Sequence, residues 1–203
     1  MTTTNQETQE SLDSRFEFRV FGDDLQSLRD LFSHGKMIKK ESISDEIYLI
    51  LQTSSNFNIK IRDNTLEIKK LIAKSDFLEQ WEPLCKLSFP INVQDYKELF
   101  TLLQIKLPIV NQNRYTKEQF LSVIQSYHYI DRIKVHKQRT QYIVDDIIIE
   151  TADVEIEGIN LQTICFESTN KEKLHKLLCE LHLSKMQNTN YLEEIKLLKE
   201  HLS

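Results

Sequence analysis

The chain has 203 residues, 40% of them hydrophobic, which is enough to bury the core of one large or two small domains. Glycine and proline number three each, and neither GxxxxGK[ST] nor GxGxxG occurs, which excludes the phosphate-binding loops built from glycine. The formal net charge of −5 argues against bulk electrostatic binding to DNA or to an anionic membrane. Any cationic site must therefore be concentrated in one place.

The cysteines and the N-terminal residues indicate the compartment. Cys85, Cys165 and Cys179 are odd in number and widely spaced, which is typical of reduced thiols rather than of a disulfide framework or a zinc site. Residues 1–13 are polar and lack the basic start and apolar centre of a signal peptide, so we expect a flexible tail. No apolar run approaches the length of a membrane span. These features favour a cytoplasmic protein.

Along the chain, the spacing of apolar residues alternates between the periods of strands and helices. The period of two predicts strands over 15–22, 36–41, 45–51, 56–62, 65–72, 84–91, 132–144, 147–157 and 160–168. The helical period predicts helices over 23–35, 94–103, 116–127, 171–183 and 190–202. No linker divides this series, so we expect one α+β domain over 14–203.

Most predicted strands have one apolar face and one charged face. In RFEFRVFG, for example, Arg15, Glu17 and Arg19 lie on the opposite face from Phe16 and Phe18. The same alternation gives further inward-facing candidates, which are Asn58, Lys60, Arg62, Glu67, Lys69, Lys137, Arg139, Asp153, Glu155 and Glu157, with Lys86 as a weaker one. Closure of about eight mostly antiparallel strands into a barrel, with helices packed outside, would remove the sheet edges and enclose these charges. The alternative is a solvated sheet face with cross-strand salt bridges.

A tunnel with basic and acidic walls suits a metal-bound polyphosphate. Lysine and arginine neutralise phosphate oxygens, while carboxylates hold Mg²⁺ or Mn²⁺. The motifs RFEFR, NIKIR, LEIKK, VHKQR followed by Tyr142, and TICFE, taken in this order, resemble the CYTH or triphosphate tunnel metalloenzyme superfamily. The resemblance extends from about residue 14 to the C-terminal helices. It implies an eight-stranded antiparallel barrel whose tunnel binds triphosphate and a divalent metal, as in thiamine triphosphatases, tripolyphosphatases, RNA triphosphatases and one class of adenylate cyclase.

The resemblance also implies roles for individual residues, with two departures from the family pattern. The opening ExExK motif falls on Arg15, Glu17 and Arg19, so an arginine replaces the first carboxylate, and Cys165 replaces the first carboxylate of the late ExE motif. The implied catalytic residues are Glu17 and Glu167. The implied ligands of Mg²⁺ or Mn²⁺ are Glu17 and Glu167 with Asp153, Glu155 or Glu157. The implied phosphate-binding residues are Arg15, Arg19, Lys60, Arg62, Lys69, Lys86, Lys137 and Arg139.

Two functions therefore compete. The first is binding of a nucleoside or inorganic triphosphate, extended to metal-dependent hydrolysis if the reduced metal site still works. The second is a catalytically degenerate module that binds a nucleotide or a partner through the same tunnel. Leu192, Ile195, Leu198 and Leu202 in the last helix are expected to pack on the barrel, with a homodimer seam as the alternative.

Overall fold

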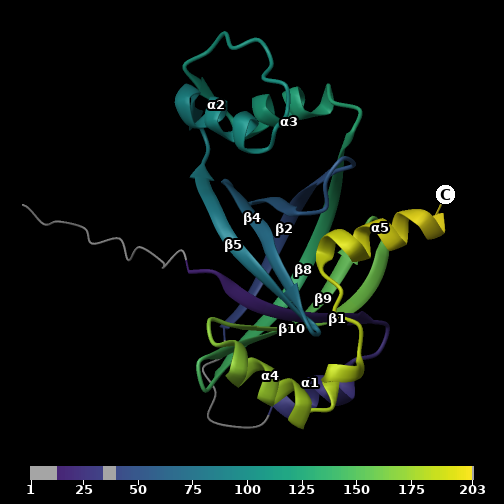
Figure 1. Ribbon diagram of the computed structural model, residues 1–203. Helices are drawn as coiled ribbons and strands as arrows, with labels where there is room; N and C mark the ends of the chain where they lie inside the picture. Colours follow the sequence, from purple (N-terminus) through teal and green to yellow (C-terminus); the bar gives the residue numbers. More distant parts are fainter. Residues whose placement is uncertain (1–12, 34–39, 203) are drawn as a thin grey trace, which may run out of the picture.

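A closed barrel of antiparallel strands forms the body of the protein in the computed structural model, which describes residues 13–33 and 40–202 (Figure 1). The barrel strands are β1 (Arg15–Gly22), β2 (Lys40–Leu51), β3 (Phe57–Arg62), β4 (Thr65–Ser75), β5 (Leu78–Ser88), β8 (Ile130–Val144), β9 (Ile147–Ile156) and β10 (Ile159–Ser168). They follow one another around the barrel as β1-β10-β9-β8-β2-β3-β4-β5, and β5 pairs with β1 to close it. The predicted eight-stranded antiparallel barrel of an α+β protein is confirmed.

The register of β1, β10 and β9 places three inward-facing side chains in one row. Arg19 of β1 is opposite Cys165 of β10, and Cys165 is in turn opposite Glu150 of β9. One row nearer the start of β1, Glu17 is opposite Glu167. Because side chains alternate between the two faces of a strand, Phe18 and Phe166 point outward from the same strands.

The helices are α1 (Gln26–Ser33), α2 (Val93–Leu102), α3 (Lys117–Gln125), α4 (Lys171–Glu180) and α5 (Tyr191–Leu202), with a short 3₁₀ turn at Leu183–Lys185. The side chain of Asn92 caps α2, and a capping box between Thr116 and Gln119 begins α3. Two further short strands, β6 (Ile91–Asn92) and β7 (Arg114–Tyr115), pair just before these two helices. None of the described helices has the length and apolar character needed to cross a membrane.

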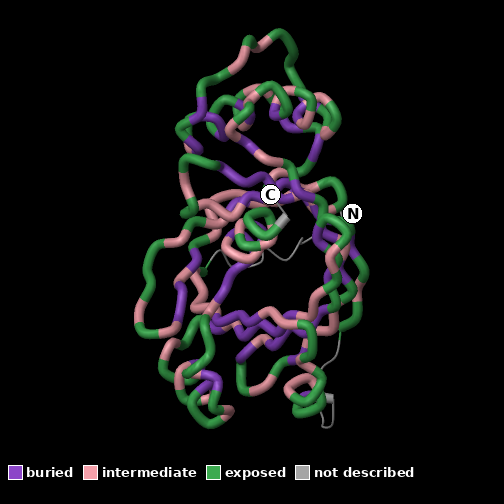
Figure 2. Tube along the Cα trace, turned by 90° about the vertical axis from the view of Figure 1, so that its right-hand side faces the viewer, coloured by how far each residue is buried: buried purple, intermediate pink, exposed green. Residues whose placement is uncertain are grey.

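Two hydrophobic clusters cover the outer face of the barrel. The helices α1 and α4 pack on β1, β9 and β10 through a cluster that includes Phe32, Leu174 and Leu178. The helices α2 and α3 pack on β2, β3 and β4 through a cluster that includes Phe100 and Phe120. Figure 2 shows that the buried stretches of chain concentrate in the barrel strands and the helix faces, while the connecting loops are exposed.

The last helix, α5, lies inside one end of the barrel. Its residues Tyr191, Leu192 and Ile195 are at most 4% exposed. They join a cluster with inward-facing side chains of the surrounding strands, which are Phe21, Tyr48, Ile50, Leu71, Ile133, Val135, Ala152, Val154, Ile156 and Leu161. The face that was considered as a homodimer seam is thus used for packing within the chain at Leu192, Ile195 and Leu198.

Some element boundaries differ from those predicted. The two strands predicted over 36–41 and 45–51 belong, where described, to one strand, β2, because residues 42–44 continue the ladder with β8. The strand β5 begins at Leu78, six residues before its predicted start. Residues 1–12 of the tail predicted over 1–13, and the predicted helix end at Gly35, lie outside the described residues.

Candidate functional site

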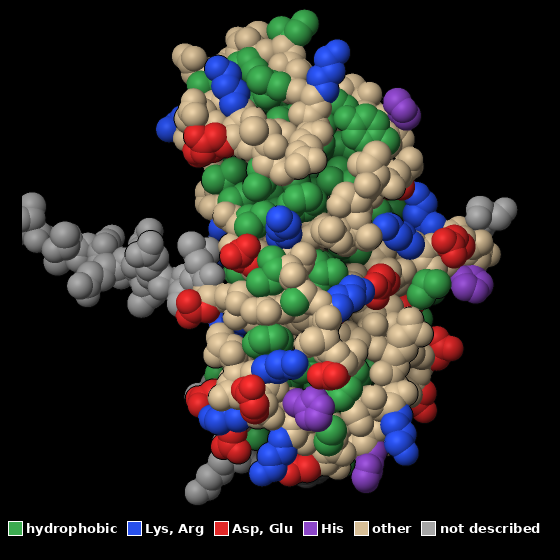
Figure 3. All heavy atoms as spheres, viewed as in Figure 1, with side chains coloured by type: hydrophobic (Ala, Val, Ile, Leu, Met, Phe, Trp, Pro, Cys, Tyr) green, Lys and Arg blue, Asp and Glu red, His purple; other side chains and the backbone are tan. Residues whose placement is uncertain are grey.

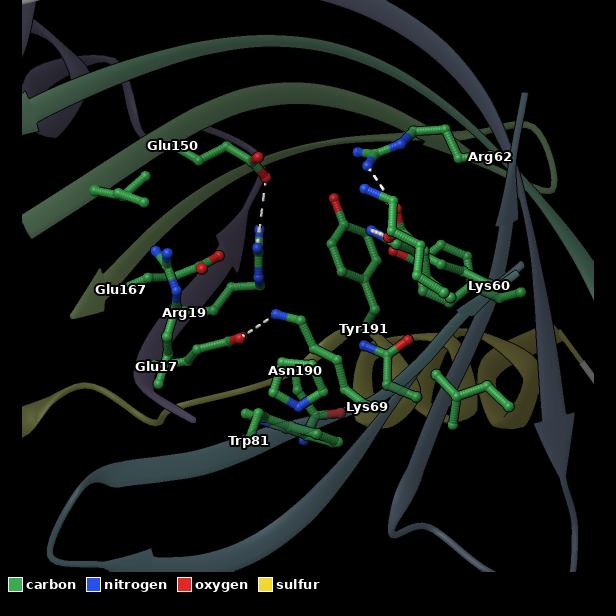
Figure 4. Close-up of a pocket in the computed structure, with 18 of the residues that line it drawn as sticks. Glu17, Arg19, Lys60, Arg62, Lys69, Trp81, Glu150, Glu167, Asn190 and Tyr191 are labelled. Carbon is green, nitrogen blue, oxygen red and sulfur yellow. Dashed lines mark hydrogen bonds and ion pairs between the residues drawn. The ribbon is translucent and has the colours of Figure 1, made fainter. Parts of the chain in front are cut away.

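The inner faces of the strands enclose a chamber of about 430 Å³. Among the described residues, eight cationic side chains line it: Arg15, Arg19, Lys60, Arg62, Lys69, Lys86, Lys137 and Arg139. Five carboxylates share the walls: Asp13, Glu17, Glu67, Glu150 and Glu167. Figure 4 shows labelled members of both groups pointing toward one another from opposite walls. Every cation that the sequence pattern predicted for the site therefore reaches the chamber, although its role in phosphate binding stays a prediction.

The outer surface has a different charge distribution. On the face seen in Figure 3, lysine and arginine side chains are interspersed with aspartate and glutamate. The high density of cations is a property of the chamber, which agrees with a protein whose net charge is negative.

At the deep end of the chamber, Arg19 is held by two partners. Its guanidinium lies 3.4 Å from Glu150 and donates a hydrogen bond of 3.2 Å to the hydroxyl of Thr163. Glu150 also pairs with Arg139 at 3.3 Å. Burial would by itself raise the pKa of Glu150, but the charges of Lys137, Arg19 and Arg139 lower that pKa to about 2. The carboxylate is therefore ionised and fixes both guanidinium groups.

A second ionic network lies on β2, β3, β4 and β8. Glu67 contacts Lys60 at 3.3 Å and Arg62 at 2.9 Å. The fully buried Glu46 contacts Lys137 at 3.3 Å and accepts a hydrogen bond of 3.1 Å from the hydroxyl of Tyr48. Burial would raise the pKa of Glu46, but Lys137 and neighbouring cations lower it far below its usual value. These pairs hold the cations in place at the chamber wall.

The third group surrounds Glu17. Lys69 donates a hydrogen bond of 2.6 Å to Glu17, and the pKa of Lys69 is raised, because its neighbours Glu17 and Glu167 outweigh the effect of burial. Burial and the nearby charge of Glu17 both raise the pKa of Glu167. The thiol of Cys165 lies 3.7 Å from Glu167, and burial raises its pKa well above the usual value. This corner thus combines one lysine-bound carboxylate, one carboxyl of weakened acidity and a protonated thiol.

The donor atoms of Glu17, Cys165 and Glu167 lie within 4.8 Å of one another, close enough to share one ion. Mg²⁺ and Mn²⁺ prefer oxygen ligands, and a neutral thiol is a poor one. Glu17 is already paired with Lys69. These residues by themselves do not fit a resident Mg²⁺ or Mn²⁺ ion.

The structure does not bring the predicted acidic ligands Asp153, Glu155 and Glu157 to the chamber. Asp153 points outward and binds Arg29 of α1 through contacts of 2.6 and 3.0 Å, while Glu155 lies with it along a separate surface hollow. Glu157 follows the strand in a turn, where its carboxylate accepts a hydrogen bond from the backbone of Lys134. The inward face of this strand carries Val154 and Ile156 instead, because α5 supplies an apolar surface there.

Other chamber residues were missed by the sequence pattern. Glu150 is inward-facing on the same strand, in IIIETA, where its apolar neighbours conceal the alternation. Glu46 was missed on β2, and Asn190 and Tyr191 reach the chamber from the beginning of α5. The sequence did contain a signal for Glu150, because its even spacing from Val154 and Ile156 places all three side chains on one face of the strand. No local pattern predicts that a C-terminal helix enters a barrel.

Comparisons with known proteins show that the chain is similar in fold to solved structures. No protein-family model matches the chain, and no curated protein matches it. A conserved hypothetical protein from Pyrococcus furiosus is 16% identical, with a TM-score of 0.51 over 87% of this chain and 98% of that one. A candidate adenylate cyclase from Bacillus halodurans is 13% identical, with a TM-score of 0.49 over 90% and 98% of the two chains. The S. pombe Pct1 RNA triphosphatase in complex with the Spt5 CTD is 11% identical, with a TM-score of 0.34 over 94% and 83%.

The barrel fold is shared with the Pyrococcus furiosus protein. The closed antiparallel barrel of eight strands, with a charged interior, is also the architecture that the resemblance to the CYTH family implied. At these levels of identity the comparisons support the fold, and the chemistry of the chamber has to be argued from its own residues.

Proposed function

We propose that the chamber binds a small phosphorylated anion, a nucleoside triphosphate or inorganic tripolyphosphate. The observation that supports this most strongly is the convergence of eight cationic side chains from five strands on one cavity. Buried cations are costly unless they are paired, and here eight cations outnumber six carboxylates, which are the five that line the walls and Glu46 behind them. A polyanion would supply the missing negative charge.

The size of the chamber and the kind of donors fit this ligand. A volume of about 430 Å³ lies in the usual range for small-molecule sites. Arginine forks and lysine ammonium groups bind phosphate oxygens through charge-assisted hydrogen bonds. These groups recognise phosphate and do not distinguish one base from another, so the proposal concerns the polyphosphate portion of the ligand.

Calorimetric titration of the protein with tripolyphosphate, in the presence of EDTA, tests the proposal. Lys60→Met removes a chamber cation, whereas Lys70→Met removes an exposed cation of the adjacent strand that does not line the chamber. We expect binding to the wild type and to Lys70→Met, and at least a tenfold loss of affinity in Lys60→Met, since a hydrogen bond to a charged group contributes about 1.5 kcal/mol or more. Absence of binding to the wild type would refute the proposal.

Metal-dependent hydrolysis is the second candidate, and the observation in its favour is the cluster of Glu17, Cys165 and Glu167. The lysine contact of Glu17 and the thiol at residue 165 oppose it. Phosphate release from tripolyphosphate, ATP, GTP and thiamine triphosphate, measured with Mg²⁺, Mn²⁺ or EDTA, separates the two functions. Turnover that needs metal and disappears in Glu17→Ala and Glu167→Ala would establish the hydrolase. Binding in EDTA without turnover under any condition would establish the binding module.

A further inference from the structure

A buried hydroxyl group at the deep end of the chamber has no hydrogen-bond partner among the described residues. It belongs to Tyr191, the first residue of α5, which is 4% exposed. Buried polar groups in proteins are nearly always hydrogen-bonded, so an isolated donor that faces a cavity indicates a bound partner. Figure 4 shows Tyr191 rising from α5 with its hydroxyl directed into the space between Arg19 and Lys60.

The ring of Tyr191 is held in a fixed position by its neighbours. Tyr48 stacks on it with ring centroids 5.1 Å apart, and Phe21 meets it edge-on at the same distance. Two chamber cations lie over the ring, Lys137 at 4.2 Å and Arg19 at 4.8 Å from its centroid. Burial raises the pKa of Tyr191 well above its usual value, so the hydroxyl keeps its proton and acts as a donor. A donor on a ring that contacts two cations is suited to an anionic acceptor.

The position of α5 makes the two ends of the chamber different. The helix fills one end of the barrel with apolar side chains, so a ligand enters from the other end. The exposure of the cationic side chains follows this axis: Lys137 and Arg19, beside Tyr191, are 3% and 8% exposed, whereas Lys86 is 55% exposed. The part of a ligand that enters first therefore meets Tyr191.

We propose that Tyr191 donates a hydrogen bond to the terminal phosphate of a polyphosphate that binds end-on, so that the chamber selects molecules with a free phosphate end. This inference rests on the proposed function and specifies its ligand class. A phosphodiester, whose phosphates are esterified on both sides, has no such end to place against α5. The helix thus acts as a specificity element as well as part of the core.

Tyr191→Phe tests the role of the hydroxyl, because it keeps the ring, its stacking and its contacts with Arg19 and Lys137. The matched control is Tyr96→Phe, which removes from α2 another buried hydroxyl that has no partner in the described part of the chain and that lies in the outer cluster. We expect tripolyphosphate to bind Tyr191→Phe at least tenfold more weakly than the wild type, with Tyr96→Phe unchanged. Thermal unfolding of the free proteins verifies that both variants are folded. Equal affinities of Tyr191→Phe and wild type, or an equal loss in both variants, would overturn the inference.

The requirement for a free end is tested with two ligands, ATP and diadenosine tetraphosphate, which is esterified at both ends. We expect ATP to bind the wild type at least tenfold more tightly. Similar affinities would overturn end-on binding while leaving the proposed function intact. Failure of tripolyphosphate and ATP alike to bind the wild type would instead overturn the proposed function, and this inference with it.

Discussion

Arg19 and Glu150 meet at 3.4 Å across the barrel wall, although the strand β10 lies between their own strands. The residue between them in the row is Cys165, whose small side chain leaves room for the guanidinium to reach the carboxylate. A carboxylate at that position would compete with Glu150 for Arg19.

Replacement of Glu150 by glutamine is expected to destabilise the protein by about 3 kcal/mol at pH 7, because it leaves the buried guanidinium of Arg19 and the partly buried one of Arg139 without their common counterion. The pKa of Glu150 is about 2 in the folded protein and about 4.3 in an unfolded chain. The stabilisation is thus complete above the unfolded value and is lost as the pH falls toward 2. Urea unfolding at pH 7 and at pH 3 measures this. A difference between wild type and Glu150→Gln that does not shrink in acid would contradict it.

Glu167→Gln is expected to stabilise the protein at high pH, whereas Glu150→Gln destabilises it. Burial and Glu17 raise the pKa of Glu167, so the native state binds this proton more tightly than the unfolded chain does. Stability is then lost as the pH rises from the ordinary glutamate value through the raised one. The glutamine variant lacks this loss, so its melting temperature at pH 8 should exceed that of the wild type. The exposed Glu82→Gln is the control, and a lower melting temperature in Glu167→Gln than in the control would refute the prediction.

Phosphate binding should respond to the charge of Lys60. Burial lowers the pKa of this lysine, and the nearby carboxylate of Glu46 offsets only part of the effect. As the pH rises toward the ordinary lysine value of about 10.4, Lys60 loses its charge before an exposed lysine does. Tripolyphosphate affinity, measured from pH 7 to 9.5, should fall further in the wild type than in Lys60→Arg, by up to about tenfold. Parallel profiles for the two proteins would show that Lys60 stays charged throughout.

Because α5 packs inside the barrel, alanine substitutions at different positions of this helix should reduce stability by different amounts. Ile195 is 1% exposed within the barrel end, while Leu197 is 41% exposed. Ile195→Ala should cost about 2–5 kcal/mol in the free energy of unfolding, as expected for a buried large-to-small substitution, and Leu197→Ala much less. Denaturant unfolding of the two variants provides the measurement. Similar small losses at both positions would mean that α5 does not fill the barrel in solution.

The cationic part of the site followed from sequence because of strand periodicity. In RFEFR and NIKIR the apolar positions alternate strictly with charged ones, and the apolar set needs a helix-covered face, which leaves Arg15, Arg19, Lys60 and Arg62 to point inward. The carboxylates of the site could not be predicted from strand periodicity in the same way. On β9, both faces carry apolar residues, since α4 covers the outer face near Ile149 and α5 covers the inner face near Val154.

The sequence by itself determined the position of most strands and which side chains of β1, β3, β4 and β8 share a face, because these depend on alternation within single strands. Closure of the strands into a barrel was a prediction that the structure confirmed. Only the tertiary structure decided which carboxylates neutralise the cations and that α5 closes the chamber with Tyr191 at its deep end. These depend on register between strands and on the docking of a helix from the far end of the chain. The contacts of Arg19 with Glu150 and with Tyr191 join residues more than a hundred positions apart, and local hydrophobic spacing carries no information about them.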